Sequence, residues 1–180
     1  MTITSEPPVQ TSIPTHDEMI ARAEAMLPAI RERAGEVEKN RRMSDETMAE
    51  FTAAGFHKIL QPKRFGGYEL GPATALEVIR TLAKGDGSAG WDYNLFIIHN
   101  YQVSLFSEQA QEEYWADGYD KLCSTVSFAT KSDAVRVDGG WRLTGRWKFS
   151  SGCDFATWFI IMKPSATVTD WMLVPLSDVS

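Results

Sequence analysis

The sequence is poor in cysteine and in long apolar runs, and each shortage excludes a class of protein. Its two cysteines, Cys123 and Cys153, are too few for a disulfide framework and lack the spacing of metal ligands. No run of about 18 apolar residues could span a bilayer, and the polar N-terminal segment has no signal-peptide core. We therefore expect reduced thiols, no metal site, no membrane partner and a cytoplasmic location.

Positive charge is also scarce. Lysine and arginine total 18 against 24 acidic residues, which gives a formal net charge of -6. No basic cluster is longer than Arg41-Arg42, so a nucleic-acid partner is not expected. The hydrophobic content of 43% and the charged content of 23% are those of a globular protein, and 180 residues are enough to bury a core.

The first two thirds of the chain has helical patterns. Residues 1–14 are predicted to be a disordered lead-in, after which Thr15 and Glu18 form a capping box. An amphipathic helix follows, and Pro28 is a candidate kink within it. Further helices are predicted at 44–55, 72–84, 89–106 and 108–116.

Two of these helices have distinct patterns. The helix at 89–106, opened by Ser88, is apolar almost all round, so we expect it at the centre of a bundle. The stripe of the helix at 72–84 that should face the core consists of Leu76, Ile79, Leu82 and Ala83.

After residue 119 the pattern changes to short strands. The segments are rich in β-branched and aromatic residues, and Asp138-Gly139-Gly140 is a typical hairpin turn. An α+β protein is predicted, with an N-terminal helical domain at 15–118 and antiparallel strands at 119–180. The predicted strands are 122–128, 134–138, 141–147, 157–162 and 170–174.

Two groups of residues are candidates for a binding site. Ser150, Ser151 and Gly152 form a corner of small residues between aromatic side chains, which could hold a planar heterocycle or be a plain turn. Trp91 and His99 lie eight residues apart on the apolar helix and hence roughly on one face. A lone histidine on such a helix is more often a satisfied core residue than a functional one.

Three stretches carry a resemblance to a known family. They are the pattern G-x-W-x-F-S-S-G-C-x-x-A-x-W from Gly145 to Trp158, the segment NRRMSDETMAEFTAAGFHKILQPKRFGGYEL, and DGSAGW…H from Asp86 to His99. The chain resembles the oxygenase components of two-component flavin-dependent monooxygenases of the acyl-CoA dehydrogenase fold, and is similar to p-hydroxyphenylacetate hydroxylase. The resemblance covers nearly the whole chain after the first dozen residues.

The resemblance implies a fold and an activity. The fold would be the helical domain followed by the start of an antiparallel β-barrel-like middle domain, at 119–180, without the C-terminal helical bundle of the family. A full-length homo-oligomer, a tetramer, would take reduced FMN or FAD from an NAD(P)H-dependent flavin reductase. It would react the flavin with O2 to a C4a-hydroperoxide and hydroxylate a small aromatic, phenol-like substrate.

The resemblance also implies roles for individual residues. His99, Ser150 and Ser151 would be catalytic, and Trp91 and His99 would line the substrate pocket. The implied flavin-binding residues are Trp147, Ser150, Ser151, Gly152, Ser127 and Thr130.

Two alternatives stay open at this point. One is an acyl-CoA dehydrogenase-type oxidoreductase, although Lys131, Trp147 and the Ser150-Ser151 pair depart from the dehydrogenase patterns and favour the monooxygenase branch. The other is an inactive truncated fragment that acts only as a folding or interaction unit, with apolar surface left exposed.

Overall fold

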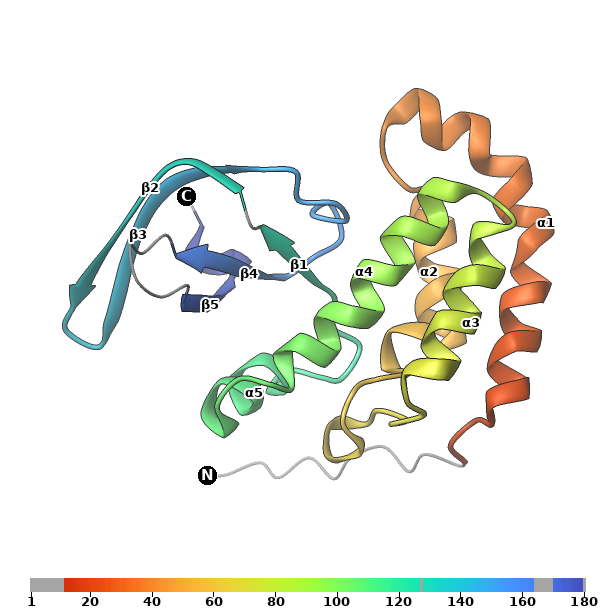
Figure 1. The fold of residues 1–180 in the computed structure, drawn as a ribbon, viewed down its shortest axis with the longest axis horizontal. Helices are drawn as coiled ribbons and strands as arrows, with labels where there is room; N and C mark the ends of the chain where they lie inside the picture. The colour runs from red at the N-terminus through yellow and green to blue at the C-terminus, as the bar shows by residue number, and fades with distance from the viewer. Residues whose placement is uncertain (1–11, 127, 164–169, 180) are drawn as a thin grey trace.

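The computed structural model describes residues 12–126, 128–163 and 170–179. Helices gather at one end of the molecule and strands at the other, and α4 runs between the other long helices and the sheet (Figure 1). The helices are α1 (His16–Asn40), α2 (Asp45–Ala54), η1 (Phe56–Lys58), η2 (Lys63–Phe65), α3 (Pro72–Ala83), α4 (Gly87–Val103), α5 (Glu108–Trp115) and η3 (Leu176–Asp178). The strands are β1 (Cys123–Val126), β2 (Phe128–Val137), β3 (Gly140–Lys148), β4 (Trp158–Lys163) and β5 (Asp170–Pro175).

Side-chain caps define the starts of α1, α2 and α5, as the sequence predicts. The Thr15 hydroxyl accepts from the Glu18 N–H while the Glu18 carboxylate accepts from the Thr15 N–H, so the predicted capping box is confirmed. Helix α1 continues through Pro28 as one element. The start of α4 differs from the prediction, because Asp86 and not Ser88 lies next to its first turn and accepts from the Ala89 N–H at 2.8 Å.

The helical core lies between α1, α2, α3 and α4. Phe51 of α2 stacks on Tyr93 of α4 with ring centroids 4.3 Å apart. The predicted inward stripe of α3 is wrong at Leu76 and Ala83, which are exposed. The neighbouring helices instead bury the smaller side chains Thr74, Ala75, Val78 and Thr81 together with Leu82.

Helix α4 is central but not buried all round. The side chains of Trp91 and Leu105 are exposed, whereas Phe96, Ile97 and Val103 are buried. The expectation of a fully buried helix is therefore wrong for one face of α4.

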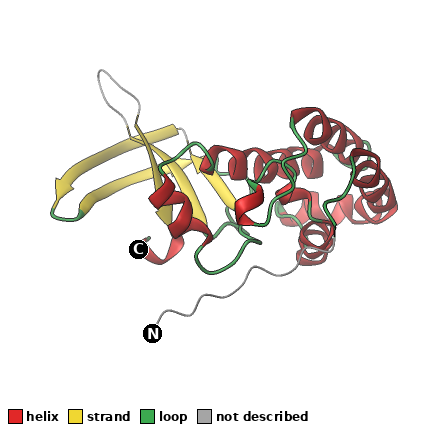
Figure 2. Cartoon of the chain, turned by 90° about the horizontal axis from the view of Figure 1, so that it is seen from below, coloured by secondary structure: helices red, strands yellow, loops and turns green. Residues whose placement is uncertain are grey.

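Within the described residues, the strands form two small sheets and no closed barrel. The first sheet has the order β1-β4-β5, and the second is the β2–β3 hairpin, which projects away from the helices (Figures 1 and 2). The pair β4–β5 and the hairpin are antiparallel as predicted, but β1 and β4 pair in parallel, with Ser124 opposite Phe159. The β2–β3 hairpin reverses the chain once, and the corner at residues 150–152 reverses it again. Strand β4 therefore runs in the same direction as β1.

A buried polar network fixes residues 116–122, the linker between α5 and β1. The Asn100 side chain on α4 donates to the backbone carbonyls of His57 and Lys121 and to the Gln61 side chain, and accepts from the Tyr114 hydroxyl. The His57 Nε2 lies 2.9 Å from an Asp120 carboxylate oxygen. These bonds hold the linker on the helices immediately before β1 begins.

Candidate functional site

The serine corner lies between β3 and β4. Its turn closes through two backbone bonds, from the Cys153 N–H to the Ser150 carbonyl at 3.2 Å and from the Phe155 N–H to the Gly152 carbonyl at 3.1 Å. Gly152 has a φ of 75°, and a Cβ added there would lie 2.5 Å from Cζ of the buried Phe96 ring. Only glycine fits this close approach, which seats the corner on α4.

Ser124 of β1 holds the corner through contacts with Ser150 and Ser151. The side chain is fully buried, its Oγ lies 2.7 Å from the Ser150 Oγ, and its O–H donates to the Ser151 carbonyl at 2.9 Å. Ser124 is not among the predicted site residues, although the stretch 124–130 is rich in small hydroxyl residues. No local pattern marks it, because its partners are 26 and 27 residues away.

Trp91 reaches the corner from the exposed face of α4. Its indole Nε1–H donates to the Ser151 Oγ at 3.1 Å, although the residue is 60% exposed. The structure thus brings together two predicted site residues that lie 60 positions apart.

A cavity of about 460 Å³ opens beside the corner, between the two sheets. This volume is in the range of small-molecule sites. The indole Nε1–H of Trp147 is buried and has no hydrogen-bond partner within the described residues. The lining includes Val126, Leu143, Thr144, Gly145, Trp147, Ser150, Phe159, Ile161 and Val174.

His99 faces β1 and not the exposed side of α4. It is 4% exposed, and its Nδ1 lies 2.8 Å from the Cys123 carbonyl oxygen. Burial lowers the pKa of His99 to about 4, and the bond to the Cys123 carbonyl opposes this only in part. The ring is therefore neutral near pH 7 with its proton on Nδ1, because a carbonyl can only accept. Nε2 is left with a lone pair.

His99 and the corner meet adjacent residues of one strand. His99 bonds the carbonyl of Cys123, and the serine corner bonds Ser124. Trp91 and His99 do not share a face, since the first is exposed and the second is buried. Of the other predicted residues, Ser127 lies outside the described residues, and of Thr130 only the backbone, in β2, is described.

The sequence analysis did not predict a role for two acidic side chains next to the corner, Asp92 and Asp154. Burial, followed by the nearby charge of Asp154, raises the pKa of Asp92 to about 6. Burial and the same Asp154 charge raise the pKa of the Cys153 thiol. Asp92 follows Trp91 directly on α4, so a change in its charge occurs beside the Trp91–Ser151 bond.

Asp92→Asn is expected to stabilise the protein at pH 7–8. The pKa of Asp92 is higher in the folded protein than in the unfolded chain, where it is near 4, so the folded state favours the protonated carboxyl. The stability that Asp92 contributes is therefore fully present below about pH 4 and is lost as the pH rises through about 6. We expect a gain of about 1–2 kcal/mol above pH 7, less than the full value of the shift because the side chain is partly exposed. Denaturant titrations at pH 4 and pH 8 measure it. Equal gains at both pH values for Asp92→Asn would contradict the assignment.

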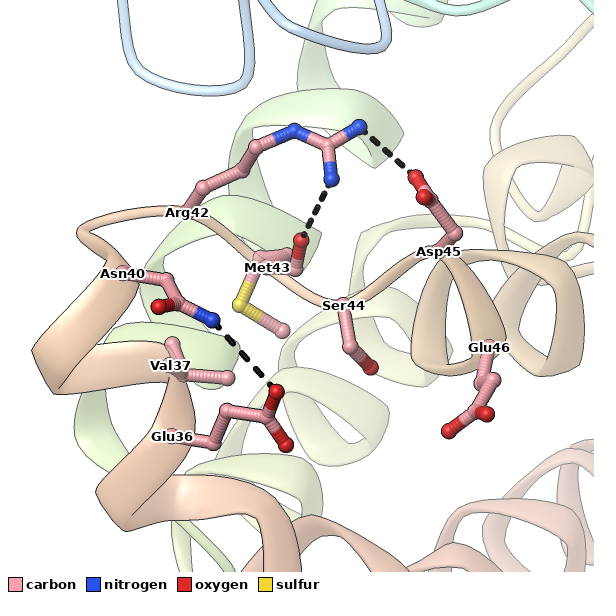
Figure 3. Close-up of a pocket in the computed structure, with 8 residues that line it drawn as sticks. All are labelled: Glu36, Val37, Asn40, Arg42, Met43, Ser44, Asp45 and Glu46. Carbon is pink, nitrogen blue, oxygen red and sulfur yellow. Dashed lines mark hydrogen bonds and ion pairs between the residues drawn. The ribbon is translucent and has the colours of Figure 1, made fainter.

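A second pocket, of about 450 Å³, lies at the junction of α1 and α2 (Figure 3). In Figure 3 the Arg42 guanidinium is bonded to Asp45 and to the Met43 carbonyl. The same guanidinium lies 4.4 Å from the centre of the Phe155 ring, at the end of the serine corner. Arg42 therefore braces the corner against the helical domain.

The fold and the corner define a class of protein. Residues 14–119 match the family described as acyl-CoA dehydrogenase, N-terminal domain, and the chain belongs to this family. It is 40% identical over 143 residues to the flavin-dependent monooxygenase, oxygenase subunit HsaA, from Rhodococcus jostii. The aligned residues cover 79% of this chain and 37% of that relative.

Solved structures agree with this assignment. The HsaA monooxygenase from M. tuberculosis superposes with a TM-score of 0.85 at 35% identity, covering 92% of this chain and 44% of that one. XiaF from Streptomyces sp., in complex with FADH2 and glycerol, superposes with a TM-score of 0.81 at 28% identity, covering 91% of this chain and 42% of that one. The predicted resemblance to flavin-dependent monooxygenases is confirmed, and the chain spans about two-fifths of the length of these relatives.

Proposed function

We propose that this chain supplies the flavin-contacting corner of the oxygenase component of a two-component flavin-dependent monooxygenase. The observation that carries the proposal is the serine corner beside a cavity lined by Trp147 and Ser150. The unpaired indole N–H of Trp147 would suit an acceptor of a heterocycle, and the flat indole would suit its ring. These residues fit a flavin.

Each residue of the corner has a distinct task in this proposal. Ser150 faces the cavity and would contact the polar edge of the ring, while Gly152 lets the backbone approach α4. The oxygen of Ser151 accepts from Trp91, so Ser151 would position the indole, and its own hydroxyl proton is left to donate. When bound, a reduced flavin supplies the electrons that activate O2 for transfer of one oxygen atom to the substrate.

His99 would accept a hydrogen bond from the substrate in this proposal. Because its Nδ1–H is used by the Cys123 carbonyl, the neutral ring offers the Nε2 lone pair as an acceptor. A phenol hydroxyl would donate a hydrogen bond to this atom and keep its proton, because the lowered pKa of about 4 makes the imidazole a weak base.

The cofactor, partner and substrate follow from the same proposal. The FADH2 bound by XiaF supports reduced FAD, with reduced FMN as the other candidate, and O2 as co-substrate. An NAD(P)H-dependent flavin reductase would deliver the reduced flavin, a small aromatic compound would be the substrate, and the oxygenase would be a cytoplasmic tetramer.

Reduced flavin is expected to bind the purified chain. An anaerobic titration with reduced FAD and reduced FMN, followed by tryptophan emission, should give saturable quenching because Trp147 lines the cavity. Trp147→Phe, which keeps a flat ring but lacks the indole N–H, should weaken binding about 5- to 20-fold through the loss of one hydrogen bond in a buried site.

The matched control is Trp171→Phe, an exposed tryptophan on β5, which should bind as the wild type does. Absence of binding by both flavins would contradict the proposed function. Concentration-dependent association of the chain without flavin would then favour an interaction unit.

A further inference from the structure

The hydrogen bonds around Ser124 can be satisfied in one direction only. A serine hydroxyl has a single proton. The bond from the Ser124 Oγ to the Ser151 carbonyl uses that proton, because a carbonyl oxygen can only accept. The contact of 2.7 Å between the two hydroxyl oxygens must therefore run from Ser150 to Ser124, with Ser150 as the donor.

The consequence appears at the cavity wall. The Ser150 hydroxyl gives its proton to Ser124, so its oxygen offers only lone pairs to the cavity that it lines. A ligand that bonds to Ser150 must bring an N–H or O–H of its own. Trp147 complements this oxygen, since its unpaired indole N–H requires an acceptor.

We infer that Ser124 is a positioning residue that makes Ser150 an acceptor, and that the corner thereby selects the reduced over the oxidised form of the flavin. The inference rests on the proposed function. A reduced isoalloxazine carries a proton on N5 and can donate there, whereas N5 of the oxidised ring has a lone pair and would meet the lone pairs of Ser150. Hydrogen bonds to ring nitrogens are one way in which a protein tunes a flavin.

The surroundings of Ser124 hold the direction of the two hydrogen bonds, from Ser150 to Ser124 and from Ser124 to the Ser151 carbonyl. Ser124 is fully buried and lies in β1, opposite Phe159 of β4. The preceding residue, Cys123, is bonded by His99. Reversal of these two hydrogen bonds would remove the donor from the Ser151 carbonyl, which costs free energy because the Ser124 side chain is fully buried.

The experiment compares affinities for the two redox forms. Wild-type chain, Ser124→Ala and the control Ser104→Ala, whose hydroxyl bonds the local Tyr101 carbonyl, are titrated anaerobically with reduced and oxidised FAD. Wild type and Ser104→Ala should bind the reduced form at least about tenfold more tightly, equal to a shift of about 30 mV in the two-electron potential of the bound flavin. In Ser124→Ala the Ser150 hydroxyl is free to donate, so oxidised FAD should bind more tightly and the ratio should fall below about threefold.

Circular dichroism checks that the variants fold, and Ser124→Cys, with its weakly donating thiol, gives a second test if the alanine variant does not. A redox ratio unchanged in a folded Ser124 variant overturns this inference and leaves the proposed function standing. Failure of the wild type to bind either form overturns both.

Discussion

Replacement of Asn100 by leucine is expected to lower the free energy of unfolding by about 3–5 kcal/mol. The side chain is fully buried, and its amide satisfies the Gln61 side chain and two backbone carbonyls, while its oxygen accepts from Tyr114. Leucine has a similar volume but leaves each of these polar groups without its partner. Because the network carries the linker, β1 should lose its fixed position as well.

Urea denaturation measures the change, and Asn94→Leu on the same helix is the matched control, expected to change stability by less than about 1 kcal/mol. Hydrogen exchange of the β1 amides gives a local test. If Asn100→Leu left both the unfolding free energy and the exchange of β1 unchanged, the network would not hold the linker.

Gly152→Ala is expected to have the second large effect, on both stability and binding. An alanine there must adopt a φ near 75° and must push its methyl group into the Phe96 ring. We expect a loss of about 2–5 kcal/mol, from about 1 kcal/mol of backbone strain and the cost of overpacking a buried ring. The corner should also move away from α4 and weaken flavin binding more than about tenfold, since the Trp91–Ser151 bond depends on that approach.

Gly139→Ala separates the two causes. Gly139 has a φ of 77°, close to that of Gly152, but an added Cβ would meet no atom within 4 Å. It should cost only the backbone strain and leave flavin affinity intact. Equal losses in the two variants would mean that contact with Phe96 has no role.

Local chemistry explains which parts of the fold the sequence predicts well. The starts of α1, α2 and α5 depend on caps three residues away in the chain, at Thr15, Ser44 and Ser107. The hairpin turn at Gly139 is equally local. The parallel pairing of β1 with β4 is not, because strand direction depends on the path of the chain between them.

The same distinction applies to the candidate site. The Ser-Ser-Gly corner is visible as a motif, and the family resemblance singles out Trp91 and His99. Ser124, Asp92 and Asn100 acquire their surroundings from residues that are distant in the chain, and nothing in their own neighbours marks them. The pattern for α3 also favoured the large Leu76 over the small residues that its neighbours bury.

The projecting β2–β3 hairpin makes the tip of the molecule permissive to engineering. Its turn at Gly139 and Gly140 has open space on the side where a side chain would grow, while the corner is joined to its opposite end. Exposed turns of this kind tolerate inserted sequence. A short peptide epitope or a fluorophore attachment site placed between these glycines would report on the protein from outside, without disturbing the bonds by which Ser124 and Trp91 hold the corner.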